Sequence, residues 1–516
     1  MGNLTTKTSW VDLDSKWITT SNTYGLYGNL ATSTDGRGKV TQFFYDDSTH
    51  ALPNRVVVDP QNTTGTQTTT TAYDYSTGLV TSQTDANGQV TTIDYTNQLL
   101  GTVDPFGRPG VTKEPEITIG VTPHKHRVTT TYIDSSRQVI VASDLNAEDD
   151  KLLKTRTTTD PLGRPVLTEQ TEDGTNYTIS VKNAYLDMGR VTLTSSATRG
   201  MAASTDSWTR VTKDSGGRVT EVASFGGATQ PAWTGTAGVF TGTVTTAYDA
   251  NFTTMTDQAG KWRRTMTDAL GRLRRVDEPD NTNNLGSTAA PVQPINYAYD
   301  VFGNLTTVTQ GAQTRTFTHD SRSRLRTAVN PESGTVSYQY DDSGNLVVKT
   351  DARSVSTHFE YDSVSRVTRR WYNSSNLLTA TTHNSPALPA GVDTTSEAKF
   401  FYDTQSLPVG APSYTRGSAV GRLVAQTYGS GSNGDYYAYD VLGRPTLKIQ
   451  QVGTVNYQMS TTYYLSGALN VLTYPSGHTV AHTYDQAARL TNLSGNLGDG
   501  TTRTYATGIQ IGRAHV

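Results

Sequence analysis

The sequence predicts an all-β fold in which tandem antiparallel β-hairpins form one continuous, coiling sheet. The pattern Tyr-Asp-x-x-Gly-Arg/Asn-Leu recurs about once every twenty residues along the 516-residue chain. The runs between copies alternate polar and apolar residues, and glycine is abundant, at 46 residues, as a chain dense in turns requires. A fixed period of this length is typical of stacked supersecondary units rather than of one compact domain with one active site.

The most regular copies of the motif lie between residues 299 and 367, where the aspartates step by 20, 21 and 21 residues. The residues that mark these turns are Tyr299, Asp300, Gly303, Asp320, Arg324, Tyr340, Asp341, Gly344, Tyr361, Asp362 and Arg366. Two later copies add Tyr439, Asp440, Gly443, Arg444, Tyr484, Asp485 and Arg489. We predict that these residues shape turns and do not carry out catalysis.

Each motif residue has a physical role in a turn. The aspartate side chain can accept the backbone N–H two residues on, and the glycine tolerates a positive φ. A four-residue connection of this kind suits a hairpin with a type I turn and a bulge. The tyrosine is expected to cover the adjacent strand with its hydroxyl at the wet edge, while Arg or Asn followed by Leu begins the next strand. A second, weaker turn falls between copies, for example at Asp257 and at Pro331.

The runs between the turns alternate with a period of two. In the run 335–340, Val336, Tyr338 and Tyr340 share one face. In the run 355–361, Val355, Thr357, Phe359 and Tyr361 share one face, and Ser356, His358 and Glu360 share the other. Such alternation of β-branched and aromatic residues predicts half-buried antiparallel strands.

The chain divides into two parts that differ in how regular the repeat is. Residues 1–247 hold degenerate copies, such as those at Asp104, Asp160 and Asp214, and residues 248–510 hold regular copies that continue the same sheet. Two stretches interrupt the repeat and predict surface loops, from Asp280 to Pro294 and from Ser374 to Thr395.

Both ends of the sequence suggest a piece of a longer protein. Residues 2–5 copy the inside of a repeat, so the chain is expected to begin in mid-hairpin. Residues 511–516 abandon the repeat and match an in-frame translation of a sequencing adapter, so we interpret them as a non-biological tail.

Composition excludes several classes of protein. The chain is 34% hydrophobic with a mean hydropathy of −0.50, which is low for a solid core but suits a single curved sheet with wet faces. The net charge is −3 without a basic stripe, which argues against a nucleic-acid partner. There is no cysteine, hence no disulfide framework. No apolar run is long enough to span a membrane, and no signal peptide is visible.

The run from Tyr299 to Val367 resembles the RHS/YD-repeat proteins, which include bacterial rearrangement-hotspot proteins, the C component of insecticidal toxin complexes and the teneurins. The resemblance is strong over residues 248–490 and looser over 45–219. It implies a sheet of hairpins that spirals into a large hollow shell, or part of one. In bacterial members the shell implies a container for a toxic C-terminal polypeptide, and in teneurin-like members it implies cell-surface adhesion.

The bacterial family closes its shell with a segment containing Asp-Pro-x-Gly-Leu, at which self-cleavage frees the toxin. Asp104-Pro105 and Asp160-Pro161 resemble it only superficially, because Arg108 and Arg164 stand where Leu is expected. We interpret both as ordinary repeat turns. The closing segment, its aspartates and the toxin are therefore expected outside this sequence.

Four other kinds of candidate site have a purely structural interpretation as their alternative. The carboxylate pairs at Asp46, Asp149 and Asp341 invite glycoside hydrolysis, but their positions favour turn caps. His124 and His126 lie at strand spacing on one face, yet a metal site needs further ligands that the neighbouring sequence does not supply. Exposed tyrosines beside aspartates could bind sugars, but their periodicity favours cross-strand packing. The sequons at Asn62 and Asn304 are weak signals.

The sequence therefore predicts a non-catalytic β-shell fragment of an RHS-repeat protein that encloses or presents a C-terminal effector, without cofactor or metal. The alternative is a cell-surface adhesion or carbohydrate-binding shell of teneurin-like type, with a glycan or protein as partner. The resemblance implies secretion or display on a bacterial surface. A carbohydrate-active enzyme is disfavoured because no non-repeating acidic cluster is visible. A fragment with raw sheet edges is also expected to be prone to aggregation.

Overall fold

The computed structural model describes residues 2–12, 15–59, 66–119, 122–199, 206–373, 396–429 and 431–509. The loop expected at Ser374–Thr395, the sequon at Asn62 and the tail 511–516 lie outside these residues. Within the described residues the regular structure consists of 39 β-strands and two short 3-10 turns, η1 (Asp134–Ser136) and η2 (Asp187–Gly189). The all-β prediction is thus confirmed.

The strands follow one another with short connections. The first fourteen are β1 (Thr6–Val11), β2 (Lys16–Tyr24), β3 (Leu30–Thr34), β4 (Val40–Tyr45), β5 (Pro53–Val58), β6 (Gln67–Asp74), β7 (Leu79–Thr84), β8 (Val90–Asp94), β9 (Val111–Ile119), β10 (Thr122–Ile133), β11 (Gln138–Ser143), β12 (Leu153–Thr159), β13 (Pro165–Thr171) and β14 (Tyr177–Leu186). The next eleven are β15 (Val191–Ser195), β16 (Thr198–Arg199), β17 (Ser207–Lys213), β18 (Val219–Gly226), β19 (Val239–Asp249), β20 (Phe252–Thr256), β21 (Trp262–Thr267), β22 (Leu273–Glu278), β23 (Gln293–Tyr299), β24 (Leu305–Gln310) and β25 (Gln313–His319). The last fourteen are β26 (Leu325–Asn330), β27 (Gly334–Tyr340), β28 (Leu346–Thr350), β29 (Ser356–Tyr361), β30 (Val367–Asn373), β31 (Ala398–Tyr402), β32 (Leu423–Tyr428), β33 (Gly434–Tyr439), β34 (Pro445–Val452), β35 (Val455–Tyr463), β36 (Leu469–Thr473), β37 (Thr479–Tyr484), β38 (Leu490–Gly495) and β39 (Arg503–Ala506).

Consecutive strands pair antiparallel along the described chain, so the sheet is a continuous meander. The one departure is near β14, which pairs with both β15 and β16, while β15 pairs with β17. The pairing passes residue 248 without a break, because β19 joins β18 to β20. The register shifts at the motif tyrosine, as between Ala298 and Tyr299, which is the bulge that the sequence predicts.

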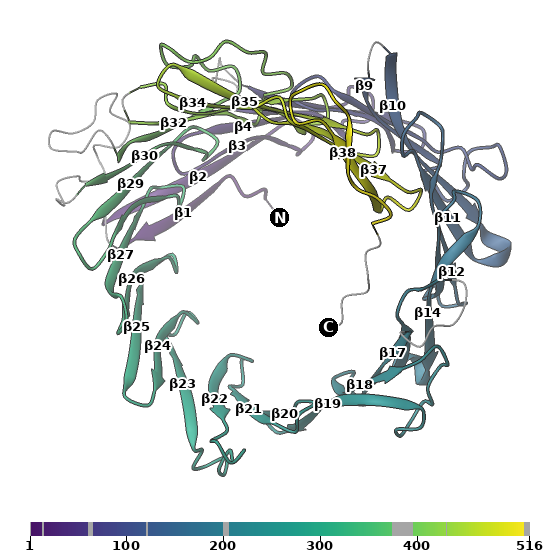
Figure 1. The fold of residues 1–516 in the computed structure, drawn as a ribbon. Coiled ribbons are helices and arrows are strands. Elements are labelled where there is room, and N and C mark those ends of the chain that lie inside the picture. The colour runs from purple at the N-terminus through teal and green to yellow at the C-terminus, as the bar shows by residue number, and fades with distance from the viewer. Residues whose placement is uncertain are drawn as a thin grey trace.

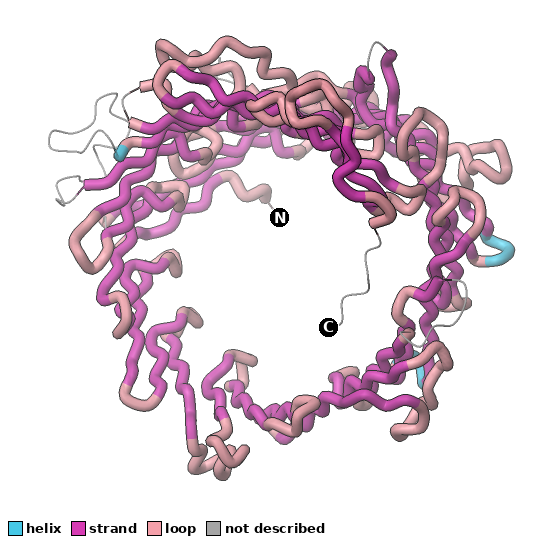
Figure 2. The backbone as a smooth tube through the Cα atoms, viewed as in Figure 1, coloured by secondary structure: helices cyan, strands magenta, loops and turns pink. Residues whose placement is uncertain are grey.

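The sheet curls into a ring (Figure 1) and continues past a full turn, as the spiral of a hollow shell. The tube drawing shows that strands form the wall almost throughout and that loops gather at its margins (Figure 2). We call β1 to β24 the first pass and β25 to β39 the second pass. The two passes touch, since the β25–β26 turn bonds to the β1–β2 turn: Asp12 Oδ1 accepts the Ser321 N–H at 3.2 Å.

A meander places successive turns on opposite margins of the sheet, which gives the wall two rims. The rim that holds the motif turns, such as those at Asp74, Asp160, Asp300 and Asp485, is called the YD rim. The other is called the counter rim, and it holds the turns between them, such as the β3–β4 turn at Asp35. This geometry decides which turns of the two passes meet.

Few side chains are fully buried, because most of the wall is one sheet thick. One buried cluster consists of Leu193, Trp208, Ala223 and Phe225, and the loop residue Trp233 packs against it. A second consists of Ala425, Tyr436 and Ile449, covered in part by Tyr414. In both places a long loop folds back over the sheet and supplies a second layer.

One strand differs from its expected pattern of faces. Strand β29 matches the predicted run, but its polar face is the buried one: Ser356, His358 and Glu360 are buried, and the apolar face is half-buried. His358 stacks on the buried Trp371 with 5.2 Å between ring centroids, and Glu360 lies 3.6 Å from Arg369. On this strand the buried face is therefore polar, and aromatic stacking and charge pairing compensate for its burial.

Candidate functional site: the seam between the two passes

Each motif turn is closed by its aspartate. At Asp300, Oδ1 accepts the N–H of Phe302 at 2.9 Å and that of Asn304 at 2.8 Å, and Oδ2 accepts the Asn304 side-chain amide at 2.8 Å. These bonds, the Asn304 side chain first, hold the pKa of Asp300 below its usual range. Gly303 completes the turn with a φ of 89°, in the left-handed region that favours glycine.

The residue four positions after the aspartate is a second part of the cap. In the Asp320 turn the Arg324 Nε–H donates to Oδ2 at 2.6 Å, and in the Asp362 turn Arg366 does so at 2.7 Å. Asn and Arg alternate at this position because both carry an N–H donor at the required reach. The sequence showed the alternation of Arg and Asn, but the donor role was missed.

The motif tyrosines join one repeat to the preceding one. The Tyr340 hydroxyl donates to the Leu325 carbonyl at 2.9 Å, and the Tyr361 hydroxyl donates to the Leu346 carbonyl at 2.7 Å. Burial raises the pKa of Tyr340 and of Tyr361. The hydroxyls are therefore bonded to backbone and do not simply face water as expected. The Arg324 guanidinium lies 4.8 Å from the Tyr340 ring centroid, which adds a cation–π contact between repeats.

The predicted turn residues all lie on the YD rim, in six turns. They are Tyr299, Asp300 and Gly303 in β23–β24, Asp320 and Arg324 in β25–β26, Tyr340, Asp341 and Gly344 in β27–β28, Tyr361, Asp362 and Arg366 in β29–β30, Tyr439, Asp440, Gly443 and Arg444 in β33–β34, and Tyr484, Asp485 and Arg489 in β37–β38. The last five of these turns belong to the second pass. They face the counter rim of the first pass, and we call this line of contact the seam.

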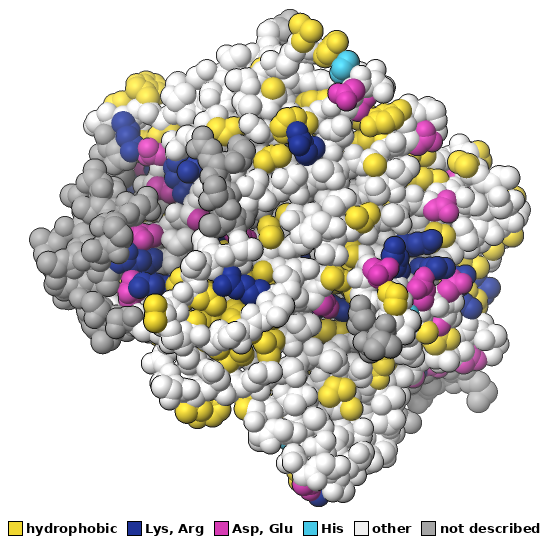
Figure 3. Space-filling view, turned by 90° about the horizontal axis from the view of Figure 1, so that it is seen from above, with side chains coloured by type: hydrophobic (Ala, Val, Ile, Leu, Met, Phe, Trp, Pro, Cys, Tyr) yellow, Lys and Arg dark blue, Asp and Glu magenta, His cyan; other side chains and the backbone are white. Residues whose placement is uncertain are grey.

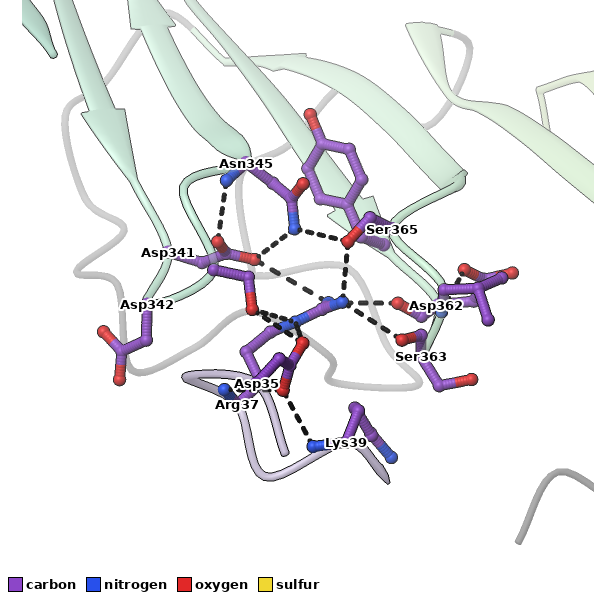
Figure 4. Close-up of polar contacts among 12 residues, drawn as sticks. Asp35, Arg37, Lys39, Asp341, Asp342, Asn345, Asp362, Ser363 and Ser365 are labelled. Atoms are coloured by element: carbon purple, nitrogen blue, oxygen red, sulfur yellow. Dashed lines mark hydrogen bonds and ion pairs between the residues drawn. The ribbon is translucent and has the colours of Figure 1, made fainter. Parts of the chain in front are cut away.

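Arg37, in the β3–β4 turn, is the centre of the seam (Figure 4). Its Nε donates to Ser343 Oγ at 3.1 Å, its Nη1 to the Asp362 carbonyl at 3.0 Å and its Nη2 to Ser365 Oγ at 2.9 Å. Asp341 Oδ2 lies 3.7 Å from Nη1. One guanidinium thus ties two motif turns of the second pass to the first, using the planar fork that lysine lacks.

The backbone approaches very closely beside Arg37. A Cβ on Gly36 would lie 2.7 Å from the Asp342 carbonyl oxygen and 2.7 Å from Ile18 Cγ2. Only a glycine leaves room for this approach. Lys16 adds an ion pair at the same turn, with its Nζ 2.6 Å from Asp342 Oδ1.

The seam continues around the ring with different chemistry at each turn. The Asn87 side chain donates to the Val420 carbonyl at 3.1 Å and accepts the Val420 N–H at 2.8 Å. Farther on, Ser466 donates its N–H to the Leu145 carbonyl at 3.1 Å, and Leu145 and Leu465 are both only 1% exposed. At the last turn Arg489 pairs with Glu172. The hydrogen-bonded residues are separated by 306 to 333 positions, which gives the length of one turn of the spiral.

Cavities lined mainly by polar residues interrupt the seam. One of about 560 Å³ is lined in part by Thr34, Asp35, Lys39, Ser363 and Ser365. Another of about 550 Å³ lies between Gln83, Thr84 and Glu114 on the first pass and Val441 and Leu442 on the second. The two passes therefore touch at turn tips and leave polar hollows between them.

One titratable pair lies next to the second cavity. Glu114 Oε2 is 3.3 Å from His126 Nδ1. The contact with His126 lowers the pKa of Glu114, and the contact with Glu114 raises the pKa of His126. Of the two histidines considered for a metal, His126 thus has an acidic partner that the sequence did not reveal. The described ranges contain no group of three or more potential ligands of the His, Cys, Asp and Glu types placed to hold a metal ion.

The seam residues of the first pass were missed by sequence reasoning. Asp12, Lys16, Arg37, Asn87 and Glu172 fall in the degenerate half of the chain and share no motif. Their partners lie more than 300 residues away, so no local pattern marks them.

In the described part of the chain no helix has the length and apolar character needed to cross a bilayer.

Comparisons with known proteins agree with this geometry. The chain resembles the solved structure of TcdB2-TccC3-TEV, with a TM-score of 0.68, 11% identity, and 95% of this chain and 29% of that chain covered. It also resembles TcdB2-TccC3 without its hypervariable C-terminal region, with a TM-score of 0.52, 12% identity, and 96% and 32% covered. These identities establish likeness of fold alone, and this chain spans about a third of those chains or less. A comparison with curated protein sequences found no match.

The family model described as Teneurin YD-shell matches residues 60–369, which is more than half of the chain. That range includes the motif turns from Asp104 to Asp362 and most of the first pass. The family match and the wound, seam-joined sheet point to the same conclusion. The chain belongs to the Teneurin YD-shell family.

Proposed function

We propose that this chain is a non-catalytic wall of a hollow shell that encloses a polypeptide effector. The observation that carries the proposal is the seam, because a sheet that only curled would leave its margins open. Here Arg37, Asn87 and Glu172 join the second pass to the first along several turns. Each described strand also pairs with its neighbours, which leaves few strand edges open.

The surface supports a container more than a single binding site. On the face of the wall that Figure 3 shows, positive and negative side chains lie close together amid a mostly uncharged surface. The seam cations are engaged by carbonyls, hydroxyls and carboxylates of the wall itself. Such a wall acts sterically: it keeps a polypeptide inside away from proteases and solvent partners. The resemblance to bacterial shell proteins supports an effector as the content and a site of action outside the producing cell.

Protection of an enclosed polypeptide tests the proposal. A flexible reporter with one recognition site for a sequence-specific protease is joined after Ile509, and its cleavage is timed beside the free reporter. We expect slower cleavage in the intact chain and a return toward the free rate in Arg37→Ala with Glu172→Ala, which opens the seam at two turns. Cleavage of the intact chain at the free rate would overturn the proposal.

The matched control is Arg353→Ala. Arg353 also lies two residues after a turn aspartate, but its side chain is 81% exposed and contacts Asp351 of its own turn. Its loss should leave the reporter protected. If Arg353→Ala exposes the reporter as much as the seam variant does, the loss of protection reflects general destabilisation and the seam does not act as the seal.

A further inference from the structure

Asn87, in the β7–β8 turn, makes its contact across the seam with a side-chain amide that uses both its polar atoms. Its Nδ2 donates to the Val420 carbonyl at 3.1 Å, and its Oδ1 accepts the Val420 N–H at 2.8 Å. An amide can form this pair of bonds because it carries a donor and an acceptor side by side, whereas a carboxylate carries acceptors alone. The chemical state of this one side chain therefore decides whether both bonds can form.

The residue after Asn87 is Gly88, and this pair of residues has a reaction of its own. The backbone nitrogen of a glycine can attack the side-chain carbonyl carbon of the preceding asparagine, since no Cβ obstructs the approach. The new N–C bond closes a succinimide ring, the bond from that carbon to Nδ2 breaks, and Nδ2 leaves as ammonia with the proton of the glycine nitrogen. Water then opens the ring and leaves aspartate or isoaspartate. Gly88 is exposed, so water can reach it.

The closed seam holds every group of the protein that takes part in this reaction. The attacking nitrogen is bonded, since the Gly88 N–H donates to the Asp85 carbonyl at 3.0 Å. The leaving group is Nδ2 of Asn87, the atom that donates to Val420. Because the Asn87 side chain reaches across to the second pass, its carbonyl carbon can meet the Gly88 nitrogen only after both bonds to Val420 break. Deamidation of Asn87 is therefore expected to require opening of the seam at this turn.

We propose that Asn87 is a deamidation site that the closed seam protects, and that its reaction makes an opening of the seam irreversible at this turn. Once Asn87 becomes aspartate, the Val420 carbonyl loses its donor and faces a carboxylate oxygen, which repels it. Isoaspartate also lengthens the backbone and displaces the side chain. The site depends only on the contact between Asn87 and Val420, and not on any content of the shell.

The chain contains a matched pair for comparison, Asn433-Gly434, which is its other Asn-Gly sequence. Asn433 is exposed in the β32–β33 turn, and its Oδ1 accepts the Gly453 N–H at 2.7 Å within the second pass. That bond requires an acceptor alone, which aspartate also provides. Asn433 thus shares the reaction of Asn87, but its contact does not join the two passes and does not need the amide donor.

Val420→Pro should open this contact with little effect on the turn that carries it. The proline ring removes the N–H that Asn87 accepts. Val420 is the second residue of a turn that the Arg422 N–H closes on the Ala419 carbonyl at 2.9 Å, and Gly421 follows with a φ of 83°. Proline is common at that position of such a type II turn, so the turn should keep its shape.

Peptide mapping by mass spectrometry, during incubation at mildly alkaline pH, measures deamidation at both asparagines. In the chain unfolded by denaturant, Asn87 and Asn433 should react at similar rates. In the folded chain Asn87 should react about tenfold more slowly, because its two hydrogen bonds must break first. Val420→Pro should speed the reaction of Asn87 and leave Asn433 at its rate in the parent. The proposal is overturned if Asn87 reacts as fast folded as unfolded, or if Val420→Pro leaves Asn87 unchanged or speeds both asparagines alike.

Substitution by the reaction product tests whether the opening is irreversible. Asn87→Asp should raise the rate of amide hydrogen exchange at Val420 about tenfold, because one bond is lost and a repulsive contact replaces it. Exchange at Gly453 should stay at the parent rate in this variant. The matched control Asn433→Asp should also leave Gly453 unchanged, because a carboxylate still accepts that N–H. Exchange at Val420 that is equal in Asn87→Asp and in the parent would show that the product re-forms the contact, and would contradict the proposal.

Discussion

At the scale of single residues, each of these turns is held together by one aspartate carboxylate. In the Asp320 turn, Oδ1 accepts the N–H groups of Arg322 and Arg324, both at 2.9 Å, and Oδ2 accepts the Arg324 side chain. The aspartate is buried, so these bonds replace the water that the carboxylate has lost. The repeated aspartates thus satisfy the backbone N–H groups of their turns.

Loss of this cap should loosen the turn locally. Asp320→Ala leaves two backbone N–H groups and the Arg324 guanidinium without their acceptor, so we expect the local opening free energy to fall by about 1–2 kcal/mol. Amide hydrogen exchange of residues 320–326 measures it. Asp320→Asn keeps one acceptor oxygen and should lose less. Equal exchange in parent and alanine variant would contradict the role of the aspartate.

The left-handed position of the turn allows a matched pair of substitutions. Gly344 has a φ of 94° and Ala488 has a φ of 58° at the same place in their turns. Gly344→Ala should destabilise by about 1 kcal/mol, because a Cβ is strained there. Ala488→Gly relieves such strain and should be neutral or stabilising. Thermal midpoints of the two variants test this, and a midpoint raised by Gly344→Ala would be the wrong sign.

The pair of His126 and Glu114 predicts a dependence of stability on pH. Because the pKa of His126 is raised on folding, its contribution is complete below the unfolded value of about 6.5 and is lost as the pH rises through the folded value. Because the pKa of Glu114 is lowered on folding, the contribution of Glu114 to the free energy of unfolding is lost only as the pH falls through that lowered value. The stability difference between parent and His126→Gln should therefore be larger at pH 5.5 than at pH 8.5. A difference that grows with pH would contradict the assignment.

At the scale of elements, the sequence predicts the features that neighbouring residues determine, but not those that depend on residues far away along the chain. Strands β27 and β29 begin and end within one residue of the predicted runs 335–340 and 355–361, because alternation and turn residues are local signals. The burial of His358 could not be predicted from its own segment, since it depends on stacking with Trp371 on the neighbouring strand. The seam could be predicted even less. Arg37 bonds to turns more than 300 residues away, and nothing in its own turn distinguishes it from Arg353.

A substitution at Gly36, where the backbones of the two passes approach closely, tests the contact between the passes. Gly36→Ala places a methyl group against the Asp342 carbonyl, so the two passes should separate locally and amide exchange should rise at residues 341–345. The matched control is Gly431→Ala, since a Cβ there would meet nothing within 4 Å. Faster exchange at 341–345 in both variants, or in neither, would contradict the described packing.

At the scale of the whole molecule, a local repeat becomes a wound wall that contacts itself, because the period of the repeat and the curvature of the sheet bring distant turns together. Hairpins of about twenty residues turn the sheet slowly enough that the motif turns of the second pass reach the counter rim of the first after 306 to 333 residues. Coiling of the sheet was predictable from the repeat, and the hollow shell from the family resemblance. The pairing of particular turns depends on the summed curvature of many strands, which no single segment encodes.

Zero-length carbodiimide cross-linking of the isolated monomer tests the central claim most directly. Lys16 Nζ lies 2.6 Å from Asp342 Oδ1 across the seam, whereas Lys448 Nζ lies 3.2 Å from Asp435 Oδ1 on adjacent strands and serves as an internal control. If the sheet winds past a full turn and joins itself, mass spectrometry should find both the Lys16–Asp342 and the Lys448–Asp435 cross-linked peptides. Recovery of the Lys448–Asp435 link alone, with Lys16 unlinked, would contradict the wound and sealed wall.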